Sequence, residues 1–321
     1  MAGLKELRTR LETAKSTQQL TAAMKMVSVS KLRKAQDRAS RIREMCFRLM
    51  DVYRETTKGN EEYVQSHLLH KGYGNPSRVL VVVLSSDKGM CGTFNSAVCK
   101  AAEEHIRDSY GGMPLSDVGV CCIGGKAGSY FSDRGYAHFL SRDCVPASEM
   151  DYGHLSAWME EVLEAYSSGR IHQVDVVSCR PVNAATQEIR VQKLLPVSGV
   201  LERGGRALED YLRRGESAAW IDHVRKARQR AAFFRPGQMY VLPGQEAVLE
   251  SMLPKVAVLY LYFSLCQSFV AEHGARMTAM SQATDNAEEL IKDLNLKYNK
   301  LRQSGITNEL IEIVSGATAQ E

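Results

Sequence analysis

Two short glycine-bearing segments carry the residue types that most often do chemistry in α/β proteins. The first, Ser85-Ser-Asp-Lys-Gly-Met-Cys-Gly-Thr-Phe-Asn95, follows an apolar run and precedes a helical pattern. Loops in that position bind phosphate or present a nucleophile in many α/β folds. This one matches neither G-x-G-x-x-G nor G-x-x-x-x-G-K-[ST], and no histidine is placed by sequence to activate Cys91. A tight turn explains the segment better than a nucleotide-binding or catalytic role.

The second segment, Gly124-Gly-Lys126, also follows an apolar run. A phosphate-binding P-loop would need glycine where Val120 stands and serine or threonine where Ala127 stands. The eight cysteines of the chain are scattered, with no C-x-x-C pair and no adjacent histidine cluster. Scattered cysteines of this kind usually act as small buried core residues in proteins of a reducing compartment. We therefore predict no catalytic residue, no metal site and no cofactor.

Positive charge is concentrated at the start of the chain. Residues 1–58 contain 14 Lys or Arg against 6 Asp or Glu and carry +8, whereas the whole chain carries +4. A basic helix can bind nucleic acid, anionic lipid or an acidic protein surface, although it is more often a solvated face. Few aromatic residues accompany these charges, so no stacking platform for nucleic acid is formed. The longest apolar run, 256–270, is too short to span a bilayer, and any membrane association is expected to come through partners.

The two ends of the chain have the pattern of long helices. From Pro254 to Ser315 no further proline interrupts the chain, and a helix of that length would extend on the order of 90 Å. We expect Pro254 itself to kink this helix. A heptad repeat of small or apolar residues runs along it at Met277, Met280, Thr284, Ala287, Ile291, Leu294, Tyr298 and Leu301.

Residues 3–58 predict a second long helix. Its apolar stripe begins at Leu4, Leu7, Leu11 and Ala14 and then slips to Leu20, Met24 and Val27. We interpret the slip as locally altered supercoiling. Because each helix has a narrow apolar stripe and would overhang a domain of this size, the two are expected to form an antiparallel coiled coil.

Between the helices, strand and helix patterns alternate. Strands are expected at 78–84, 118–123, 137–140 and 174–178, with a more alternating antiparallel edge strand at 188–195, and helices at 95–110 and 154–167. This alternation is typical of an α/β domain with a largely parallel sheet. The predicted organisation is an N-terminal coiled-coil helix (1–58), a Rossmann-like α/β domain (77–200), a basic insertion (201–238) and a C-terminal coiled-coil helix (245–321).

Three long segments resemble the gamma subunit of F-type ATP synthases. Thr17-Gln-Gln-Leu-Thr-Ala-Ala-Met-Lys-Met-Val-Ser-Val-Ser-Lys-Leu-Arg33 is similar to the N-terminal signature of that family. The loop Ser86–Asn95 looks like the loop that follows its first strand. Ala275-Arg-Met-Thr-Ala-Met-Ser-Gln-Ala-Thr-Asp-Asn-Ala287 and Ile306-Thr-Asn-Glu-Leu-Ile-Glu-Ile-Val-Ser-Gly-Ala317 are similar to its C-terminal signature. The likeness covers both termini closely and the α/β part loosely.

The resemblance implies a role as the central rotor of a proton-translocating ATP synthase. The coiled coil would turn inside a ring of alpha and beta subunits, and its foot would sit with an epsilon-type or delta-type subunit on the membrane c-ring. Rotation would drive the catalytic sites of the beta subunits through open and closed states, so the chain itself would hold no catalytic residue. We expect a location on the matrix side of the mitochondrial inner membrane, with the cytoplasmic side of a bacterial plasma membrane as the alternative.

Particular residues are implied as partner contacts. By similarity Arg276, Arg302 and Gln303 would meet acidic or polar loops of the beta subunits, and Thr307 and Glu309 lie close to them in sequence. The implied contacts also include Met24 and Lys25 in the N-terminal helix and Ile313 and Val314 at the C-terminal tip. No charged residue lies between Glu312 and Glu321, so the tip can turn in an apolar collar without burying an unpaired charge.

The chain departs from the family pattern at several positions. Thr93 stands where glycine is usual, and Gly274 and Gly305 stand where alanine is usual. A glycine costs up to ~1 kcal/mol in a helix interior, so the helix should be locally softer at Gly305. The insertion 201–238 contains no cysteine, which excludes thiol control of the kind found in chloroplast relatives; its basic charge suggests a contact with a stator or rotor neighbour or with anionic lipid.

Two other classes of function are kept as alternatives. The first is a nucleic-acid-binding coiled-coil module, suggested by the basic N-terminal helix. The second is a nucleotide-binding enzyme built on the α/β domain. Copurification with alpha and beta subunits and a c-ring would favour the rotor, whereas salt-sensitive DNA binding or nucleotide turnover by the chain alone would favour one of the others.

Overall fold

The computed structural model describes residues 2–57, 60–183, 186–198 and 244–318 of the chain. They belong to two compact units. The helix-pair unit comprises Met1–Arg33, Met90–Gly92 and His273–Glu321, and the α/β unit comprises Lys34–Gly89 and Thr93–Glu272. The predicted insertion 201–238 lies outside the described residues.

The helices agree with most of the sequence-based expectations. The α-helices are α1 (Ala2–Thr57), α2 (Glu61–Ser66), α3 (Leu68–Lys71), α4 (Phe94–Tyr110), α5 (Gly125–Phe131), α6 (Tyr152–Ser167) and α9 (Gln245–Thr318), with 3-10 turns η1 (Leu115–Asp117) and η2 (Ala147–Glu149). The two terminal helices are confirmed, and α9 continues through Pro254. Helices α2, α3 and α5 were not predicted.

A five-stranded sheet forms the centre of the α/β unit. Its strands are β1 (Val79–Leu84), β2 (Val118–Ile123), β3 (Cys144–Val145), β4 (Gln173–Pro181) and β5 (Gln187–Leu195). The spatial order is β3-β2-β1-β4-β5, with β1, β2, β3 and β4 parallel and β5 antiparallel to β4. The α/β class, the largely parallel sheet and the antiparallel edge strand are therefore confirmed.

The third strand was predicted at the wrong place. Within 137–140, Ala137 forms only an isolated bridge to Gly119, and β3 lies at 144–145. A Cβ on Gly119 would lie 2.5 Å from a ring atom of Phe139, so the Phe139 ring packs directly against the backbone of β2 at this position. The continuous pairing with β2 is instead made by Cys144 and Val145, which lie opposite Cys122 and Ile123.

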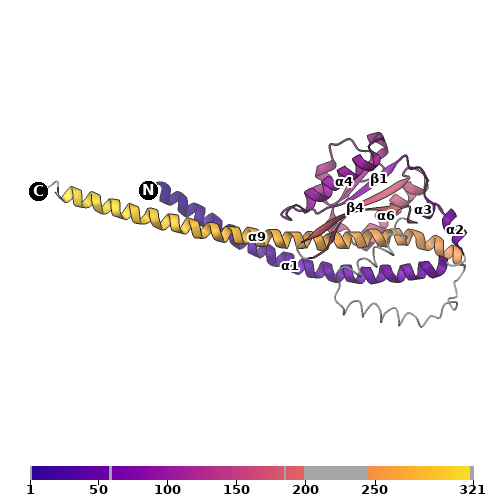
Figure 1. Cartoon of the computed structure of the whole chain (residues 1–321), viewed down its shortest axis with the longest axis horizontal. Coiled ribbons are helices and arrows are strands. Elements are labelled where there is room, and N and C mark those ends of the chain that lie inside the picture. The colour runs from indigo at the N-terminus through magenta and orange to yellow at the C-terminus, as the bar shows by residue number, and fades with distance from the viewer. Residues whose placement is uncertain (1, 58–59, 184–185, 199–243, 319–321) are drawn as a thin grey trace. The chain divides into compact units, whose positions relative to one another are not determined.

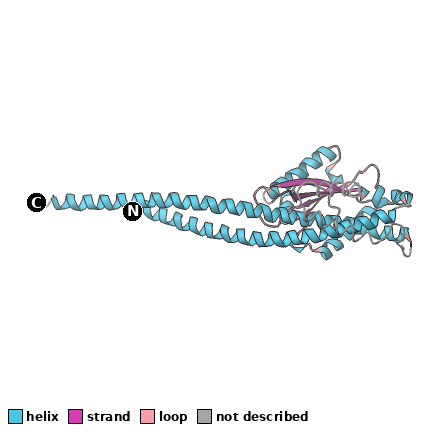
Figure 2. Ribbon diagram, turned by 60° about the horizontal axis from the view of Figure 1, so that its bottom comes forward, coloured by secondary structure: helices cyan, strands magenta, loops and turns pink. Residues whose placement is uncertain are grey.

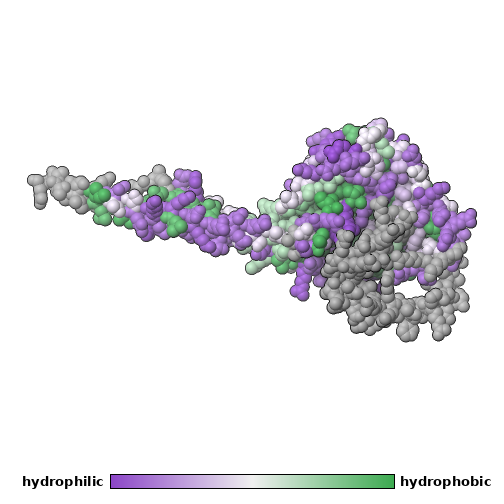
Figure 3. All heavy atoms as spheres, in the orientation of Figure 1, coloured by the Kyte–Doolittle hydropathy of each residue, from purple (hydrophilic) through white to green (hydrophobic). Residues whose placement is uncertain are grey.

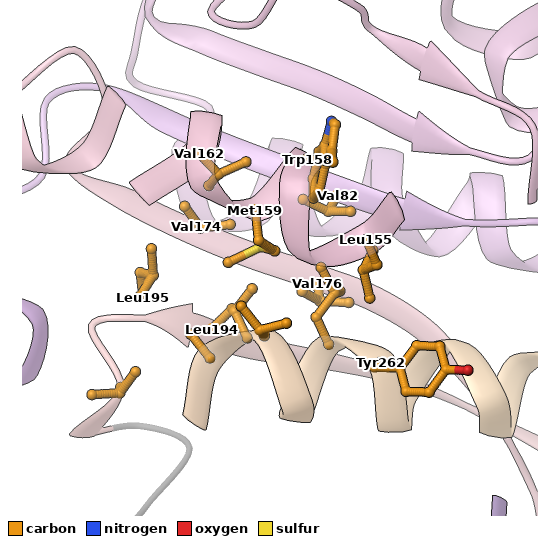
Figure 4. Close-up of a cluster of buried hydrophobic side chains, with 14 of the residues drawn as sticks. Val82, Leu155, Trp158, Met159, Val162, Val174, Val176, Leu194, Leu195 and Tyr262 are labelled. Atoms are coloured by element: carbon orange, nitrogen blue, oxygen red, sulfur yellow. The ribbon is translucent and has the colours of Figure 1, made fainter. Parts of the chain in front are cut away.

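Both faces of the central strand β1 are buried. Leu80, Val82 and Leu84 join a core with α6 and with the first part of α9, while the alternate residues of β1 are also fully buried and α4 packs against the strand. Figure 4 shows side chains of α6 directed toward the sheet and Tyr262 of α9 beside them. Such two-sided burial explains why the strand reads as a continuous apolar run.

Helix α9 belongs to both units. Residues up to Glu272 lie in the α/β unit and those from His273 lie in the helix-pair unit. Within the described residues, one 18-residue window of α9 is apolar enough by composition to cross a membrane, but 61% of it is buried inside the protein. That burial is typical of a core helix.

Candidate functional site

The helix-pair unit carries all nine residues predicted to contact partners. Helices α1 and α9 lie side by side in it (Figures 1 and 2). The Thr284 hydroxyl donates to Thr21 Oγ1 over 2.9 Å, and Lys25 Nζ donates to Ser281 Oγ over 2.9 Å. Because the residue number rises along one helix as it falls along the other, the pair is antiparallel, as predicted.

The seam between the helices repeats every seven residues. Its most buried members are Ala14, Thr21 and Ser28 on α1 and Met280, Ala287 and Leu294 on α9. This repeat confirms the heptad predicted for α9. The slip predicted for α1 is wrong, because Leu20 is 61% exposed and Val27 is 56% exposed.

Small polar residues take the seam positions of α1 in place of the larger apolar ones. The Thr21 hydroxyl donates to the Gln18 carbonyl over 3.0 Å, and the Ser28 hydroxyl donates to the Met24 carbonyl over 2.8 Å. A buried hydroxyl that bonds to its own helix leaves no unsatisfied group, so threonine and serine fill the seam at little cost. The apolar side chains of Leu20 and Val27 are consequently left on the outer surface.

The seam widens toward the N-terminus of α1. Here Glu6, Leu7 and Arg10 face Lys297, Lys300, Leu301 and Ser304 across a groove of about 470 Å³. Arg10 is paired with Glu6 over 2.7 Å on its own helix. Leu301, the last predicted member of the heptad, is 46% exposed.

Beyond this groove, no other part of the chain that the structure describes lies opposite α9. Because Thr21 lies opposite Thr284 and both helices rise ~1.5 Å per residue, Ala2 lies opposite about residue 303. In Figure 1 the C-terminal end of α9 extends past the N-terminus of α1. A Cβ on Gly305 would meet nothing within 4 Å. The paired part of α9 therefore ends next to Gly305.

One group of predicted contact residues lies in the well-packed part of the pair. Met24, Lys25 and Arg276 are half-buried, and an Arg276 guanidinium nitrogen lies 3.4 Å from His273 Nδ1. Burial, with the positive charges of Arg276 and Lys31, lowers the pKa of His273 to about 4. The imidazole is thus neutral at pH 7, and Nδ1 can accept the bond from Arg276.

The second group lies near the end of the pair. Arg302, Gln303 and Thr307 are exposed, and the Thr307 hydroxyl donates to the Gln303 carbonyl over 2.9 Å. From Arg276 to Arg302 the helix advances roughly 39 Å. The predicted contacts therefore form two levels along α9. Glu309, Ile313 and Val314 are also in α9, but their side chains lie outside the described part of the chain.

The surface of the helix-pair unit is mainly hydrophilic, with separate hydrophobic patches (Figure 3). The exposed large apolar residues of this unit are Leu20, Met26, Val27, Val29, Met90, Leu290, Leu296, Leu301, Ile306, Leu310 and Ile311.

In the α/β unit, the glycine-bearing turn at 124–126 bonds to the chain itself. Three successive backbone N–H groups donate to the loop after β1: Gly125 to Asp87 Oδ1 at 3.1 Å, Lys126 to the Ser86 carbonyl at 3.1 Å, and Ala127 to Ser85 Oγ at 3.0 Å. Amides in such a turn are the groups that would cradle a phosphate in a P-loop. Their use within the fold favours the tight-turn interpretation of both segments.

Asp87 joins three loops at this edge of the sheet. Besides Gly125, it accepts from the N–H groups of Ala147 at 2.8 Å and Ser148 at 2.9 Å. Partial burial alone would raise the pKa of the Asp87 carboxyl, but these backbone donors outweigh it and hold the pKa below its usual range. The neighbouring Cys91 is 1% exposed, so its thiol is not presented to a substrate.

Known proteins match this chain along nearly its whole length. The family described as ATP synthase matches residues 3–320. The ATP synthase gamma chain of Cytophaga hutchinsonii is 34% identical over 320 residues, which cover 99% of each chain. That of Chloroherpeton thalassium is 33% identical over 322 residues, covering 100% of this chain and 99% of the relative. The chain belongs to the ATP synthase gamma chain family.

Solved structures of ATP synthases contain chains with the same fold as this one. A chain from the central stalk and c-ring of the Tetrahymena thermophila mitochondrial ATP synthase is 24% identical, with a TM-score of 0.56, over 82% of this chain and 99% of its own. A chain of the Euglena gracilis mitochondrial ATP synthase, from a structure of OSCP, F1 and c-ring, is 19% identical, with a TM-score of 0.62, over 99% of this chain and 95% of its own. The family resemblance found in the sequence is thus confirmed.

Two features of this gamma-family chain were missed by reasoning from the sequence. One is the polar seam at Thr21 and Ser28; the seven-residue spacing of Ala14, Thr21 and Ser28 could have revealed it had small polar residues been counted as seam formers. The other is Met90, which is 64% exposed and has a left-handed backbone with φ of 61°. Methionine has no intrinsic preference for that conformation, so the sequence carries no signal for it.

Proposed function

We propose that this chain is the central rotor shaft of a proton-translocating F-type ATP synthase. It couples rotation of a membrane c-ring to the conformational cycle of the catalytic beta subunits. The observation that carries the proposal is the similarity to ATP synthase gamma chains at 34% identity along 99% of both chains. The similar structures are of a central stalk with a c-ring and of F1 with OSCP and a c-ring, and we propose F1 and a c-ring as the partners of this chain.

The helix pair suits this role mechanically. Two long helices with a close-packed seam resist bending better than one, and their polar outer face allows rotation in a partly aqueous space. We propose that Met24, Lys25 and Arg276 meet the ring of alpha and beta subunits at one level and Arg302, Gln303, Thr307 and Glu309 at another. Ile313 and Val314 would turn within the apolar collar at the tip. Each contact is expected to be weak, because a strong one would hold the rotor at one angle.

We further propose that the chain itself is not catalytic. The backbone amides of residues 125–127 are already bonded to Asp87, Ser86 and Ser85, so this turn does not offer them to a phosphate, and we assign ATP chemistry to the partner subunits. An epsilon-type or delta-type subunit would bind the foot together with the c-ring. The complex would place this chain at a membrane without inserting it.

For the membrane, we propose the matrix side of the mitochondrial inner membrane. The eight cysteines and the mitochondrial source of the two similar structures support this location. The reported sequence relatives are bacterial, which makes the cytoplasmic side of a bacterial plasma membrane the second outcome of the same experiment. Fractionation of the source cells, with the chain detected in washed mitochondria or in plasma-membrane vesicles, distinguishes the two.

The rotor function is tested by assembly and coupling. A tagged full-length chain, purified from detergent-solubilised membranes, should bring alpha and beta subunits and a c-ring in fixed proportion. Reconstituted into vesicles, the complex should pump protons when given ATP, and an inhibitor of the c-ring should stop both pumping and hydrolysis. Salt-sensitive DNA binding without these subunits, or ATP turnover by the purified chain alone, would refute the proposal.

A further inference from the structure

The α/β unit contains a polar cluster that the proposed rotor function does not use. It lies between α4 and β4, which both belong to this unit. Asp175 of β4 is 1% exposed. Its Oδ2 accepts from the Tyr110 hydroxyl over 2.5 Å, and its Oδ1 accepts from Gln173 Nε2 over 2.9 Å. Both oxygens of this buried carboxylate therefore act as hydrogen-bond acceptors.

His105 of α4 connects this carboxylate to the surface. His105 Nε2 lies 2.7 Å from Asp175 Oδ2, and His105 Nδ1 lies 3.1 Å from the hydroxyl oxygen of Ser109. Because Asp175 Oδ2 is an acceptor, Nε2 is the ring nitrogen that carries the hydrogen. In a neutral imidazole the other nitrogen is then an acceptor. The Ser109 hydroxyl therefore donates to Nδ1.

The three side chains run from the interior of the unit to its surface. Asp175 is buried, the His105 side chain is 18% exposed, and Ser109 is exposed in the last turn of α4. The spacing of four residues places His105 and Ser109 on the same face of the helix. A carboxylate, an imidazole and a hydroxyl in this order are the parts of an activated serine nucleophile. The two ring nitrogens are exchanged relative to serine proteases, but the hydroxyl still faces the nitrogen that can take its proton.

We propose that Ser109 is a nucleophile that accepts small activated acyl groups, with His105 as its general base and Asp175 as the positioning residue. Ser109 Oγ forms an ester bond to the acyl carbon while the bond from that carbon to the leaving oxygen or sulfur breaks. The hydroxyl proton moves to His105 Nδ1 and from there to the leaving group. An acyl donor fits because this step needs a base and an exposed nucleophile, and the cluster supplies both. The product is an acylated chain, and the inference does not depend on the rotor function.

The experiment treats the full-length chain with p-nitrophenyl acetate, an ester with a good leaving group. Peptide mass spectrometry then measures the rate at which each serine is acetylated. Ser96 is the matched control, since it is exposed on the same helix but its hydroxyl donates to the Thr93 carbonyl over 3.0 Å. The variants are Ser109→Ala, His105→Gln and Asp175→Asn, each checked for folding by circular dichroism.

A second measurement reports the hydrogen positions on the imidazole independently of reactivity. Nitrogen NMR of the chain with labelled histidines distinguishes a ring nitrogen that carries hydrogen from one that does not. The signals of His105 are identified by their loss in His105→Gln. In the unsubstituted chain we expect hydrogen on Nε2 and none on Nδ1.

We expect Ser109 to be acetylated about 100-fold faster than Ser96, at the lower end of what a positioned general base contributes. His105→Gln should remove this difference, and Ser109→Ala should lose the modification at this position while acetylation of Ser96 stays the same. Asp175→Asn should slow acetylation of Ser109 at least about tenfold and should move hydrogen to Nδ1 in part of the molecules.

Equal rates at Ser109 and Ser96 would show an ordinary hydrogen bond between neighbouring side chains and would overturn the proposal. A rate at Ser109 that His105→Gln leaves unchanged would overturn it too, as would hydrogen on Nδ1 in the unsubstituted chain. Unchanged acetylation in Asp175→Asn would overturn the role of Asp175. If Asp175→Asn fails to fold, His105→Gln and the spectrum of the unsubstituted chain decide.

Discussion

The hydroxyl pair in the seam gives a quantitative test of how the helix pair is held together. We consider Thr21→Val, Thr284→Val and the double substitution, because valine has nearly the shape of threonine without its hydroxyl. Thr21 is 8% exposed, so its environment is set by the seam. The four proteins form a double-mutant cycle that isolates the interaction between the two side chains.

The hydrogen bonds set the expected magnitude. In Thr21→Val the Thr284 hydroxyl loses its acceptor but can turn to the Met280 carbonyl, 2.7 Å away. In Thr284→Val the Thr21 hydroxyl keeps its bond to the Gln18 carbonyl. Each single substitution should therefore cost at the lower end of the usual range, about 0.5–1 kcal/mol. The double substitution leaves no unpaired partner and should be nearly neutral or stabilising.

Hydrogen exchange of backbone amides in 18–28 and 281–287 measures the free energy of local opening. A coupling free energy of about 1 kcal/mol should appear, which is about a fivefold change in the opening equilibrium. Thr17→Val is the control, since the exposed Thr17 hydroxyl makes the same bond to its own helix, donating to the Thr13 carbonyl over 2.9 Å. If the double substitution costs the sum of the two singles, the hydroxyls do not interact and the account of the seam is wrong.

Three further predictions concern other parts of the chain. Gly305→Ala should raise the free energy of local opening in 300–311 by about 1 kcal/mol and so slow amide exchange there, because the added methyl group meets nothing within 4 Å and lowers the conformational entropy of the unfolded chain; unchanged exchange would show that the helix is not soft there. Asp175→Asn should destabilise the α/β unit by roughly 3 kcal/mol in urea unfolding, because Asp175 is 1% exposed and its carboxylate accepts from Tyr110 over 2.5 Å and lies 2.7 Å from His105 Nε2; a cost below 1 kcal/mol would contradict this. His273 should make the helix pair acid-sensitive: its pKa falls from 6.5 to about 4 on folding, so the folded state binds fewer protons between these values. Helix-pair stability from this group is complete above pH 6.5 and is lost as the pH falls through about 4, and His273→Gln should remove that dependence of amide exchange.

Much of the architecture followed from periodicity alone. The long helices, the central strands and the antiparallel edge strand have strong patterns because each buries a defined face. Short helices and strands were missed or misplaced where tertiary contacts, and not the local pattern, decide the secondary structure. Helix α5 begins at a pair of glycines, and Gly128 within it is required because a Cβ there would lie 2.3 Å from Cys144 Sγ. Local sequence carries no trace of a neighbour 16 residues away.

The candidate site was predictable only in part. Family resemblance supplied the contact residues, and the heptad of α9 supplied its buried face. The seam of α1 was misassigned because apolar size was taken as the mark of burial. In a close-packed helix pair the buried positions need small side chains, and the hydroxyls of Thr21 and Ser28 are satisfied within their own helix. Leu20 and Val27 are larger, and they face outward.

Gly305 lies where the paired part of the two helices ends and the exposed apolar segment of α9 begins. The paired part of the shaft ends where Ala2 lies opposite about residue 303, so the described part of α1 stops supporting α9 next to a glycine, which costs a helix interior about 1 kcal/mol relative to alanine. On the unpaired side, Ile306, Leu310 and Ile311 are at least half exposed. Apolar side chains on a single unsupported helix would be unfavourable in water, so this segment needs an apolar surrounding such as the proposed collar. Flexibility at Gly305 would then let the tip stay centred in the collar while the paired shaft turns, and bending would be confined to the point where the second helix ends.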